Sequence, residues 1–433
     1  MKNKTKTFSY GKSQLTFTMS NAPLPLEKTE ALDNKNKILN RESVIKAIRS
    51  PKGTPGLNEI VNADDTVIIL APDATRRAGM DQVLPQLVDE LENIGVRCDN
   101  ITLLFATGLH GIQTREEKIR IIGKDLFDRL PNIFDHDADD QDNLAEIGEI
   151  PGVGPFKVNR RLLDADKIIC TGSVRFHPIA GFSGGGKIIL PGVSSRKTVL
   201  NMHSQDFRKG ITKNYAGILD DNPFQKSMQE AVNLVSPHFF INTVVDPYGA
   251  LLDIHAGALE PVHRSCRESV KRISGVKVKE KVPFVIVGAG GYPLDVSWFQ
   301  TVKALANWIR VLEDGGWMII VGECGKKGYA AKPGVSKPVM SHPTLDQVEE
   351  ALKKDFTMER YGLYRILLAT SRMNIIPVSE MDDAMIQRMN LKTVKGKDAT
   401  EKLHNAVRMV EADIGRDYKY YVVNQGGSFL PIF

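Results

Sequence analysis

Short apolar runs alternate with amphipathic stretches along most of the chain. The runs have the length of buried strands and are bounded by turn residues; they are Thr66–Ala71, Ile101–Ala106, Lys167–Gly172, Pro283–Ala289, Trp317–Glu323, Asn374–Ser379 and Tyr420–Asn424. Between them, apolar residues recur at helical spacing in Gln82–Gly95, Val296–Glu313, Thr344–Asp355, Leu363–Arg372 and Glu401–Gly415. This alternation predicts an α/β fold with mainly parallel sheets flanked by helices.

The length of 433 residues exceeds what one hydrophobic core usually serves. A charged stretch, Arg272–Pro283, is followed at once by a new strand–glycine–helix unit. We therefore predict an N-terminal domain over residues 1–277 and a C-terminal α/β domain over residues 278–433. In such sheets ligands bind where strands end and loops lead into helices, so the loops after the strands are the first places to search for a site.

Two strand-end loops carry polar residues that a plain turn would not need. The loop APDATRRAG contains Asp73, Thr75, Arg76 and Arg77, and the planar fork of an arginine suits a carboxylate or phosphate. The loop ATGLHG places His110 between glycines, where it is a candidate acid–base group. The alternative is a pair of solvent-exposed turns in which these side chains have no chemical role.

The third loop, GFSGGGKI, ends with Lys187 and Ile188 and matches the first part of a P-loop. Ile188 has no hydroxyl group for Mg²⁺. The following residues, IILPGVSS, contain a proline and predict extended chain, where a P-loop needs a helix. A P-loop-like ATPase or kinase thus remains only a rival hypothesis.

The fourth loop, GAGGYPLDVSWFQTVK, begins like a dinucleotide fingerprint, but Pro293 replaces the third glycine. We predict Asp295 as the N-cap of the helix that follows. An apolar stripe is expected along that helix, formed by Val296, Phe299, Val302, Ala306 and Ile309. Gln300 and Lys303 are three residues apart near the start of this helix, as an anion-binding pair or as ordinary surface residues.

Composition narrows the class of protein. Hydrophobic residues make up 42% and charged residues 25%, as in ordinary globular proteins. The net charge of +5 is spread out, so we expect no nucleic-acid partner. We also expect no membrane association, because the chain has neither a leader-like apolar segment near its start nor a membrane-spanning run. Four scattered cysteines without C-x-x-C spacing fit a cytoplasmic protein.

Taken together, the motifs resemble those of the nickel-pincer nucleotide-dependent lactate racemase family of 2-hydroxyacid racemases and epimerases. The matching elements are D-x-T-R (Asp73–Arg76), G-L-H (Gly108–His110), H-x9-K (His177–Lys187) continuing into KIILPGVSS, His203, and G-Y-P-L-D…Q-x-x-K (Gly291–Lys303). They span most of the chain, and their order and spacing both hold.

The resemblance implies a metal-binding cofactor that is joined covalently to Lys187. It is a pyridinium-3-thioamide-5-thiocarboxylate mononucleotide that carries nickel, and His203 matches the histidine that completes the nickel coordination. The other positions that match cofactor-binding residues are Asp73, Thr75, Arg76, Gly291 and Lys303. Enzymes that build the cofactor are the implied protein partners.

The implied activity is inversion of the α carbon of a 2-hydroxy acid by reversible hydride transfer. His110 and His177 match the two acid–base histidines, and imidazoles with a pKa near ~6.5 suit that role at neutral pH. Arg76, Gln300 and Lys303 match polar residues around the substrate, and the active site is expected in the interdomain cleft.

Three residues depart from the family pattern. Arg77, Gly111 and Phe299 stand where the family often has proline, a basic residue and tyrosine. Arg77 and Arg175 add positive charge that suits a second carboxylate or a polyol acid, so lactate itself is not the favoured substrate. The alternatives are a sugar-acid (aldonate or aldarate) 2-epimerase of the same family and a non-catalytic anion- or phosphate-binding protein.

The remaining histidines lack such motif context. His136, in FDHDADD, is expected on an acidic surface turn; the others are His238, His255, His263, His342 and His404.

Overall fold

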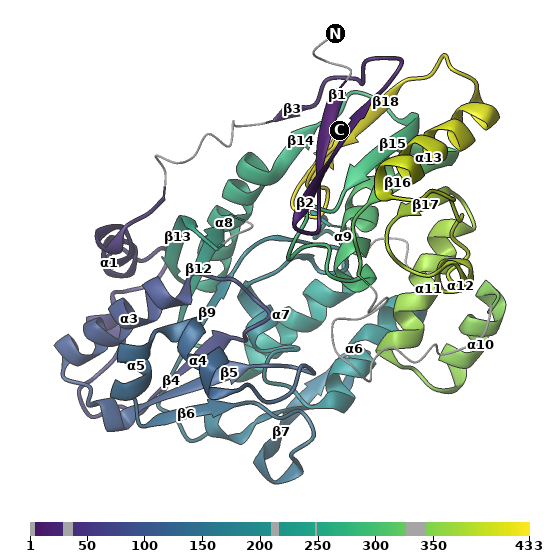
Figure 1. Cartoon of the computed structure of the whole chain (residues 1–433). Coiled ribbons are helices and arrows are strands. Elements are labelled where there is room, and N and C mark those ends of the chain that lie inside the picture. Colours follow the sequence, from purple (N-terminus) through teal and green to yellow (C-terminus); the bar gives the residue numbers. More distant parts are fainter. Residues whose placement is uncertain (1–4, 29–37, 209–215, 247–248, 326–342) are drawn as a thin grey trace. The chain divides into compact units, whose positions relative to one another are not determined.

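The computed structural model describes residues 5–28, 38–208, 216–246, 249–325 and 343–433 (Figure 1). The chain forms two compact units, residues 31–273 and residues 1–30 together with 274–433. The predicted boundary at residue 277 lies close to this division. The prediction differs at the other end of the chain, where the first 30 residues group with the C-terminal unit because Phe8 and Phe17 pack into its core.

The unit of residues 31–273 is built on one six-stranded sheet in the order β13-β12-β9-β4-β5-β6 (Figure 1). Its strands are β4 (Val67–Pro72), β5 (Ile101–Ala106), β6 (Asn132–Asp135), β9 (Lys167–Ser173), β12 (Phe239–Val245) and β13 (Leu251–Gly257). All neighbours are parallel except the edge pair β12 and β13, which is antiparallel.

Successive residues of these strands belong to two separate cores. Val67 and Ile69 of β4 join one hydrophobic cluster, whereas Ile68 and Leu70 join the other. The first cluster includes α1 (Arg41–Arg49), α3 (Met80–Ile94), α4 (Arg115–Ile122) and α5 (Lys124–Arg129). The second includes β7 (Leu144–Ile150), β8 (Gly154–Asn159), α6 (Arg196–Arg208), α7 (Pro223–Val235) and α8 (Leu259–Ser274). Burial on both faces explains why the strands read as continuous apolar runs.

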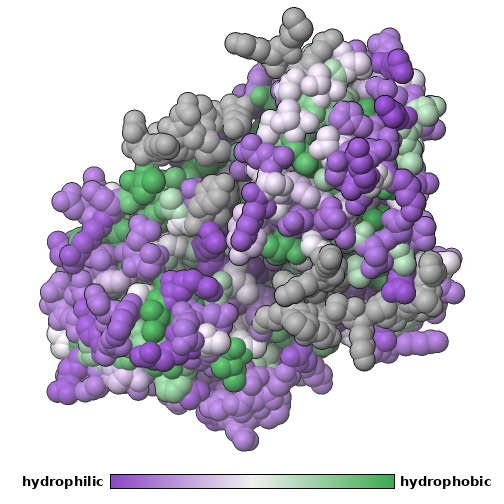
Figure 2. All heavy atoms as spheres, viewed as in Figure 1, coloured by the Kyte–Doolittle hydropathy of each residue, from purple (hydrophilic) through white to green (hydrophobic). Residues whose placement is uncertain are grey.

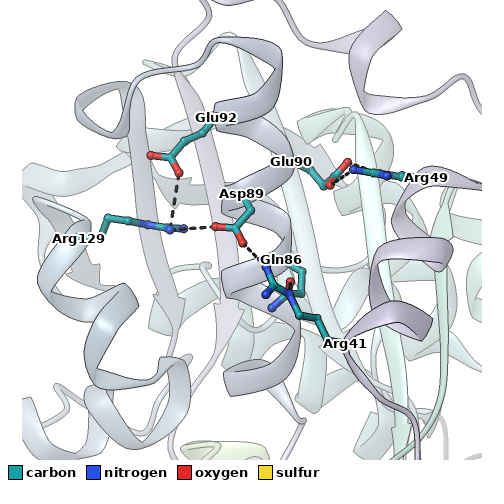
Figure 3. Close-up of polar contacts among 7 residues, drawn as sticks. All are labelled: Arg41, Arg49, Gln86, Asp89, Glu90, Glu92 and Arg129. Carbon is teal, nitrogen blue, oxygen red and sulfur yellow. Dashed lines mark hydrogen bonds and ion pairs between the residues drawn. The ribbon is translucent and has the colours of Figure 1, made fainter.

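Ion pairs connect the helices α1, α3 and α5 (Figure 3). Arg41 donates to Gln86 at 2.6 Å and pairs with Asp89 at 3.1 Å, and Arg129 pairs with Asp89 at 2.9 Å. Arg49 donates to both carboxylate oxygens of Glu90 at 2.9 Å. A shallow groove runs along these residues, but its charged groups already pair with one another, so we assign it a structural role.

The second unit has a parallel sheet in the order β17-β16-β15-β18. Its strands are β15 (Val282–Gly288), β16 (Leu312–Val321), β17 (Asn374–Val378) and β18 (Tyr420–Val423). Its helices include α9 (Trp298–Trp308), α10 (Leu345–Lys354), α11 (Met358–Thr370), α12 (Asp383–Arg388) and α13 (Ala399–Ile414). A hairpin of β1 (Thr5–Tyr10) and β2 (Ser13–Thr18) and a small sheet of β3 (Glu27–Lys28), β14 (Gly275–Lys277) and β19 (Leu430–Ile432) complete it.

The predicted fold class is confirmed, and all seven predicted strands and five predicted helices are present, with ends that shift by up to five residues. The buried face of α9 differs from the prediction. Trp298, Leu305 and Trp308 are buried, whereas Phe299 is 56% exposed, because the two tryptophans rather than the predicted stripe pack inward.

Hydrophobic residues on the face shown in Figure 2 form small patches within a mostly hydrophilic surface. Such scattered exposure is normal for a folded protein. Among the helices of the described residues, none has the length and apolar character needed to cross a membrane.

Candidate active site

His110 and Asp73 form a tight pair at the ends of two neighbouring strands. The His110 Nδ1 atom lies 2.5 Å from Asp73 Oδ2. Asp73 is only 4% exposed, and burial raises the pKa of its carboxyl group. The bond to His110, the His110 charge, the Thr75 hydroxyl and Arg76 together outweigh burial and hold that pKa below its usual value. The ionised carboxylate therefore accepts the Nδ1 proton, and the lone pair of the neutral ring lies on Nε2.

Local hydrogen bonds fix the loop that carries Asp73. The Thr75 backbone N–H and hydroxyl both donate to Asp73 Oδ1, at 2.9 and 2.5 Å. The Ala74 N–H donates to Gln113 Oε1 at 2.6 Å, and Gln113 Nε2 donates to Asp135 at 2.9 Å. Gln113 thus joins this loop to the segment just after His110, a role that its sequence context did not reveal.

His136 is a buried link between three segments, not part of an exposed acidic turn. It is 0% exposed; its Nε2–H donates to the Ser194 carbonyl at 3.0 Å, and Nδ1 accepts from Asn159 Nδ2 at 3.3 Å. Its own carbonyl accepts from the Thr107 hydroxyl at the base of the His110 loop. Burial lowers the pKa of His136, which keeps the ring neutral. The aspartates around it suggested a surface position, but its partners are distant in sequence.

The segment after Lys187 is a series of tight turns, so the prediction of extended chain is wrong. Residues Gly185–Ile188 form a 3-10 helix. Leu190 N–H then donates to the Gly186 carbonyl and Gly192 N–H to the Lys187 carbonyl, both at 3.1 Å. Gly192 in turn accepts from the Gly108 N–H at 2.9 Å. The Lys187 loop and the His110 loop are therefore directly joined.

Two buried polar side chains hold the glycines before Lys187. Asn242 of β12 accepts the Gly185 N–H at 2.8 Å. Gly184 has φ +75, and a Cβ atom there would lie 2.7 Å from Val174, so only glycine fits. His263 of α8 donates from Nε2 to the Ser183 carbonyl at 3.0 Å, and burial lowers its pKa to about 4. Both supports lie outside the motifs, and the sequence offered no signal for them.

The electrostatic setting of Lys187 favours its uncharged form. Burial, with a further contribution from the positive charge of Arg76, lowers the pKa of Lys187 to about 7. A substantial share of the side chain is thus a neutral amine at neutral pH.

The Nδ1 atom of His177 has different hydrogen-bond partners from that of His110. It lies in β10 (Phe176–His177), which pairs with β11 (Gly181–Phe182) just before the glycines. Its Nδ1 accepts backbone N–H groups of Ile179 at 3.3 Å and Ala180 at 3.0 Å. The proton of the neutral ring is then on Nε2, the reverse of His110.

His203 lies on α6, sixteen residues after Lys187. Its Nδ1–H donates to the Val199 carbonyl at 2.8 Å, and its ring stacks edge-on against Phe224 with centroids 5.0 Å apart. This tautomer puts the lone pair on Nε2, as in many metal-bound histidines. Among the described residues, no group of three or more histidines, cysteines or carboxylates has the arrangement of a metal site.

Three predicted site residues lie in the second unit. Lys303 Nζ donates to Gln300 Oε1 at 2.5 Å on α9. Gly291 has φ +74, and a Cβ atom there would lie 2.6 Å from Ser9 of the hairpin. Asp295 is not the helix N-cap, which is Ser297; instead its Oδ2 accepts the backbone N–H groups of Gly11 and Glu323, at 2.7 and 3.0 Å. Asp295 therefore ties the hairpin to the end of β16. His342 lies outside the described residues.

Comparison with known proteins shows which family the chain is similar to. The family descriptions "Lactate racemase N-terminal domain" and "Lactate racemase C-terminal domain" match residues 10–213 and 277–430. A lactate racemase of Thermoanaerobacterium thermosaccharolyticum is 32% identical over 433 residues, covering 97% of each chain. A lactate racemase of Lactiplantibacillus plantarum is 29% identical over 383 residues, covering 87% of this chain and 89% of that one.

Solved structures agree with the sequence matches. The lactate racemase apoprotein of T. thermosaccharolyticum superposes with a TM-score of 0.87 at 26% identity, over 99% of this chain and 100% of that one. A Thermotoga maritima protein at 18% identity shares the fold, with a TM-score of 0.68 over 92% of this chain. Fold and sequence define the protein as an isomerase of the racemase class. The chain belongs to the lactate racemase family.

Replacing Lys187 with methionine should change the pH dependence of stability. Between the folded pKa of about 7 and the ordinary value of 10.5, the unfolded chain binds more protons at this residue than the folded one. Wild-type stability therefore gains with rising pH in this window, and Lys187→Met lacks that gain. Without cofactor, Lys187→Met should have the higher Tm near about pH 6, with an advantage that shrinks toward about pH 10. A pH-independent difference in Tm would show that the lysine is fully charged when folded.

Replacing His136 with leucine should destabilise the first unit, because the Ser194 carbonyl and the Asn159 amide would lose their buried partner. We expect a loss of about 2–4 kcal/mol in urea unfolding. The control is His404→Leu at an exposed histidine, which should cost less than about 1 kcal/mol. An equally small loss for His136→Leu would contradict the bridging role.

Proposed function

We propose that the protein is a racemase or epimerase that inverts the α carbon of a 2-hydroxy acid, using His110 and His177 as acid–base groups. The observation that carries the proposal is the Asp73–His110 pair in a loop joined directly to the Lys187 loop, which itself follows His177. Family membership supports the reaction class. The relatives named above are lactate racemases, and the substrate class proposed for this chain is the wider one of 2-hydroxy acids.

The residues of the first unit fit a nickel-carrying mononucleotide joined to Lys187. A lysine with a lowered pKa supplies the unprotonated amine that an acyl linkage needs. His203, with its proton fixed on Nδ1 by Val199, offers an imidazole nitrogen to a late first-row metal. When bound, the group would accept and return the hydride of the α carbon. Thr75 and Arg76 are the proposed contacts for its polar groups.

His110 is the better prepared of the two histidines to remove a proton. Its Nε2 carries the lone pair, and the buried Asp73 carboxylate stabilises the imidazolium that forms when Nε2 takes the hydroxyl proton of the substrate. The same carboxylate fixes the orientation of the ring, as a third residue does in catalytic triads.

His177 presents Nε2–H to a substrate oxygen and so begins as a hydrogen-bond donor. To take up a second proton, the ring must release the backbone N–H groups that Nδ1 accepts. The two histidines therefore start in opposite protonation patterns, which suits a pair that serves opposite enantiomers in turn. Arg76 supplies a planar cation for the substrate carboxylate. On α9 of the other unit, the Gln300–Lys303 pair is proposed to bind anionic groups.

The proposal is tested by incubating single enantiomers of several 2-hydroxy acids with protein made alongside the cofactor-building enzymes. Chiral chromatography should show conversion toward a racemic or epimeric mixture. Separate His110→Ala and His177→Ala substitutions should each abolish turnover with the fold intact. Turnover by the double variant would contradict the two-base mechanism, and an absence of conversion with any 2-hydroxy acid would contradict the function.

Asp73→Asn should separate two roles of the carboxylate, which are to orient the His110 ring and to stabilise its positive charge. The amide keeps the shape but does not stabilise an imidazolium, so kcat should fall by about 10²- to 10⁴-fold. Asp139→Asn is the matched control, because Asp139 pairs with Arg196 on the surface and should leave kcat within about 3-fold. An unchanged kcat in Asp73→Asn would show that His110 works without its carboxylate.

A further inference from the structure

Arg175 lies two residues before His177, and its Nε atom is buried. Its Nη2 donates to the Arg77 carbonyl at 2.6 Å and to the Asp246 carbonyl at 3.4 Å. Its backbone N–H donates to the Ser183 hydroxyl at 3.0 Å, so the residue is fixed to the glycine segment. The Nε atom is buried and has no hydrogen-bond partner in the described part of the chain. The guanidinium is thus held in place with one buried donor, Nε–H, unused.

No carboxylate of the described residues forms an ion pair with this guanidinium. The neighbouring arginines destabilise its charged form. Burial, with the positive charge of Arg76 next in size, lowers the pKa of Arg175 to about 10; Asp246 opposes this shift and Arg77 adds a smaller lowering effect. Leaving a cation buried beside other cations is costly unless an anion compensates it. An anionic ligand beside Arg175 would therefore stabilise this part of the chain.

One substrate carboxylate does not account for these cations. Arg76 is assigned to the carboxylate next to the reacting carbon, and Lys187 has no charge once it is acylated. Arg175 then remains without a counter-charge, close enough to Arg76 for their charges to interact. The buried Nε–H can donate to one oxygen of a carboxylate, while Nη2 keeps its two backbone acceptors.

We propose that Arg175 binds the second carboxylate of a dicarboxylic 2-hydroxy acid, so that the enzyme prefers four- or five-carbon dicarboxylates over lactate. This inference rests on the proposed function for the reaction itself. An anionic oxygen group could also come from the phosphate of the mononucleotide, and the experiment distinguishes these two sources.

The test uses the cofactor-loaded enzyme and four forms of the protein. Wild type, Arg175→Met, Arg175→Lys and the control Arg49→Met are assayed with lactate, malate and 2-hydroxyglutarate. Arg49 of α1 pairs with Glu90 of α3 (Figure 3), so the control removes one positive charge from the same unit at a structural ion pair. Calorimetric titration with glutarate and with butyrate measures binding without turnover, because neither has a hydroxyl group.

Wild type should show kcat/KM at least about 10-fold higher for a dicarboxylate than for lactate. Arg175→Met should lose about 10- to 150-fold on the dicarboxylates, the range for a hydrogen bond between charged groups, and less than about 3-fold on lactate. Glutarate affinity should fall in parallel while butyrate affinity does not. Arg175→Lys, which keeps the charge but lacks the Nε–H donor, should lie between the two, and Arg49→Met should match wild type.

Three results would overturn the subsite. These are equal wild-type preference for lactate and dicarboxylates, an equal loss on all substrates in Arg175→Met, and a loss of bound mononucleotide in that variant with an unchanged substrate ratio. The last would assign Arg175 to the phosphate. Arg175-dependent binding of glutarate without racemisation of any 2-hydroxy acid would instead keep the subsite and reject the proposed reaction.

Discussion

The poor solvation of the Lys187 ammonium is the constraint on which the rest of the first unit depends. An amine in that position with Arg76 nearby cannot hold a full charge near neutral pH. The chain must then fix a glycine segment against buried partners to keep the lysine there. Asn242 from β12 and His263 from α8 do so, and each contributes one hydrogen bond to the backbone. A flexible glycine loop would let the lysine move into water and regain its charge.

The sheet also brings the His110 loop to the Lys187 loop. Alternate residues of β4 and β5 pack into two separate hydrophobic cores. The carboxyl ends of these neighbouring strands lead to Asp73 and His110. The Gly108–Gly192 bond and the buried His136 then fix the His110 loop to the turns after Lys187. Hydrogen bonds to backbone groups thus join the His110 loop to the turns after Lys187.

Much of this fold could be predicted because strands buried on both faces read as plain apolar runs. The prediction missed β12, since Asn242 and Thr243 interrupt its run, and Asn242 is polar because it supports the Lys187 loop. It misplaced His136, whose acidic neighbours in sequence do not reveal the buried Ser194 and Asn159 partners. It assigned Asp295 to a helix cap, whereas the hairpin and the end of β16 use that carboxylate. Each error comes from a partner far away in sequence.

Lys187 is proposed to carry the nickel-binding mononucleotide through a covalent bond. The most direct test is the mass of the Lys187 peptide, together with the nickel content of the intact protein, after co-production with the cofactor-building enzymes. We expect an adduct of mononucleotide size on Lys187 and bound nickel. An unmodified Lys187, from a co-production that loads a known lactate racemase, would contradict it and leave the glycine segment as a simple anion site.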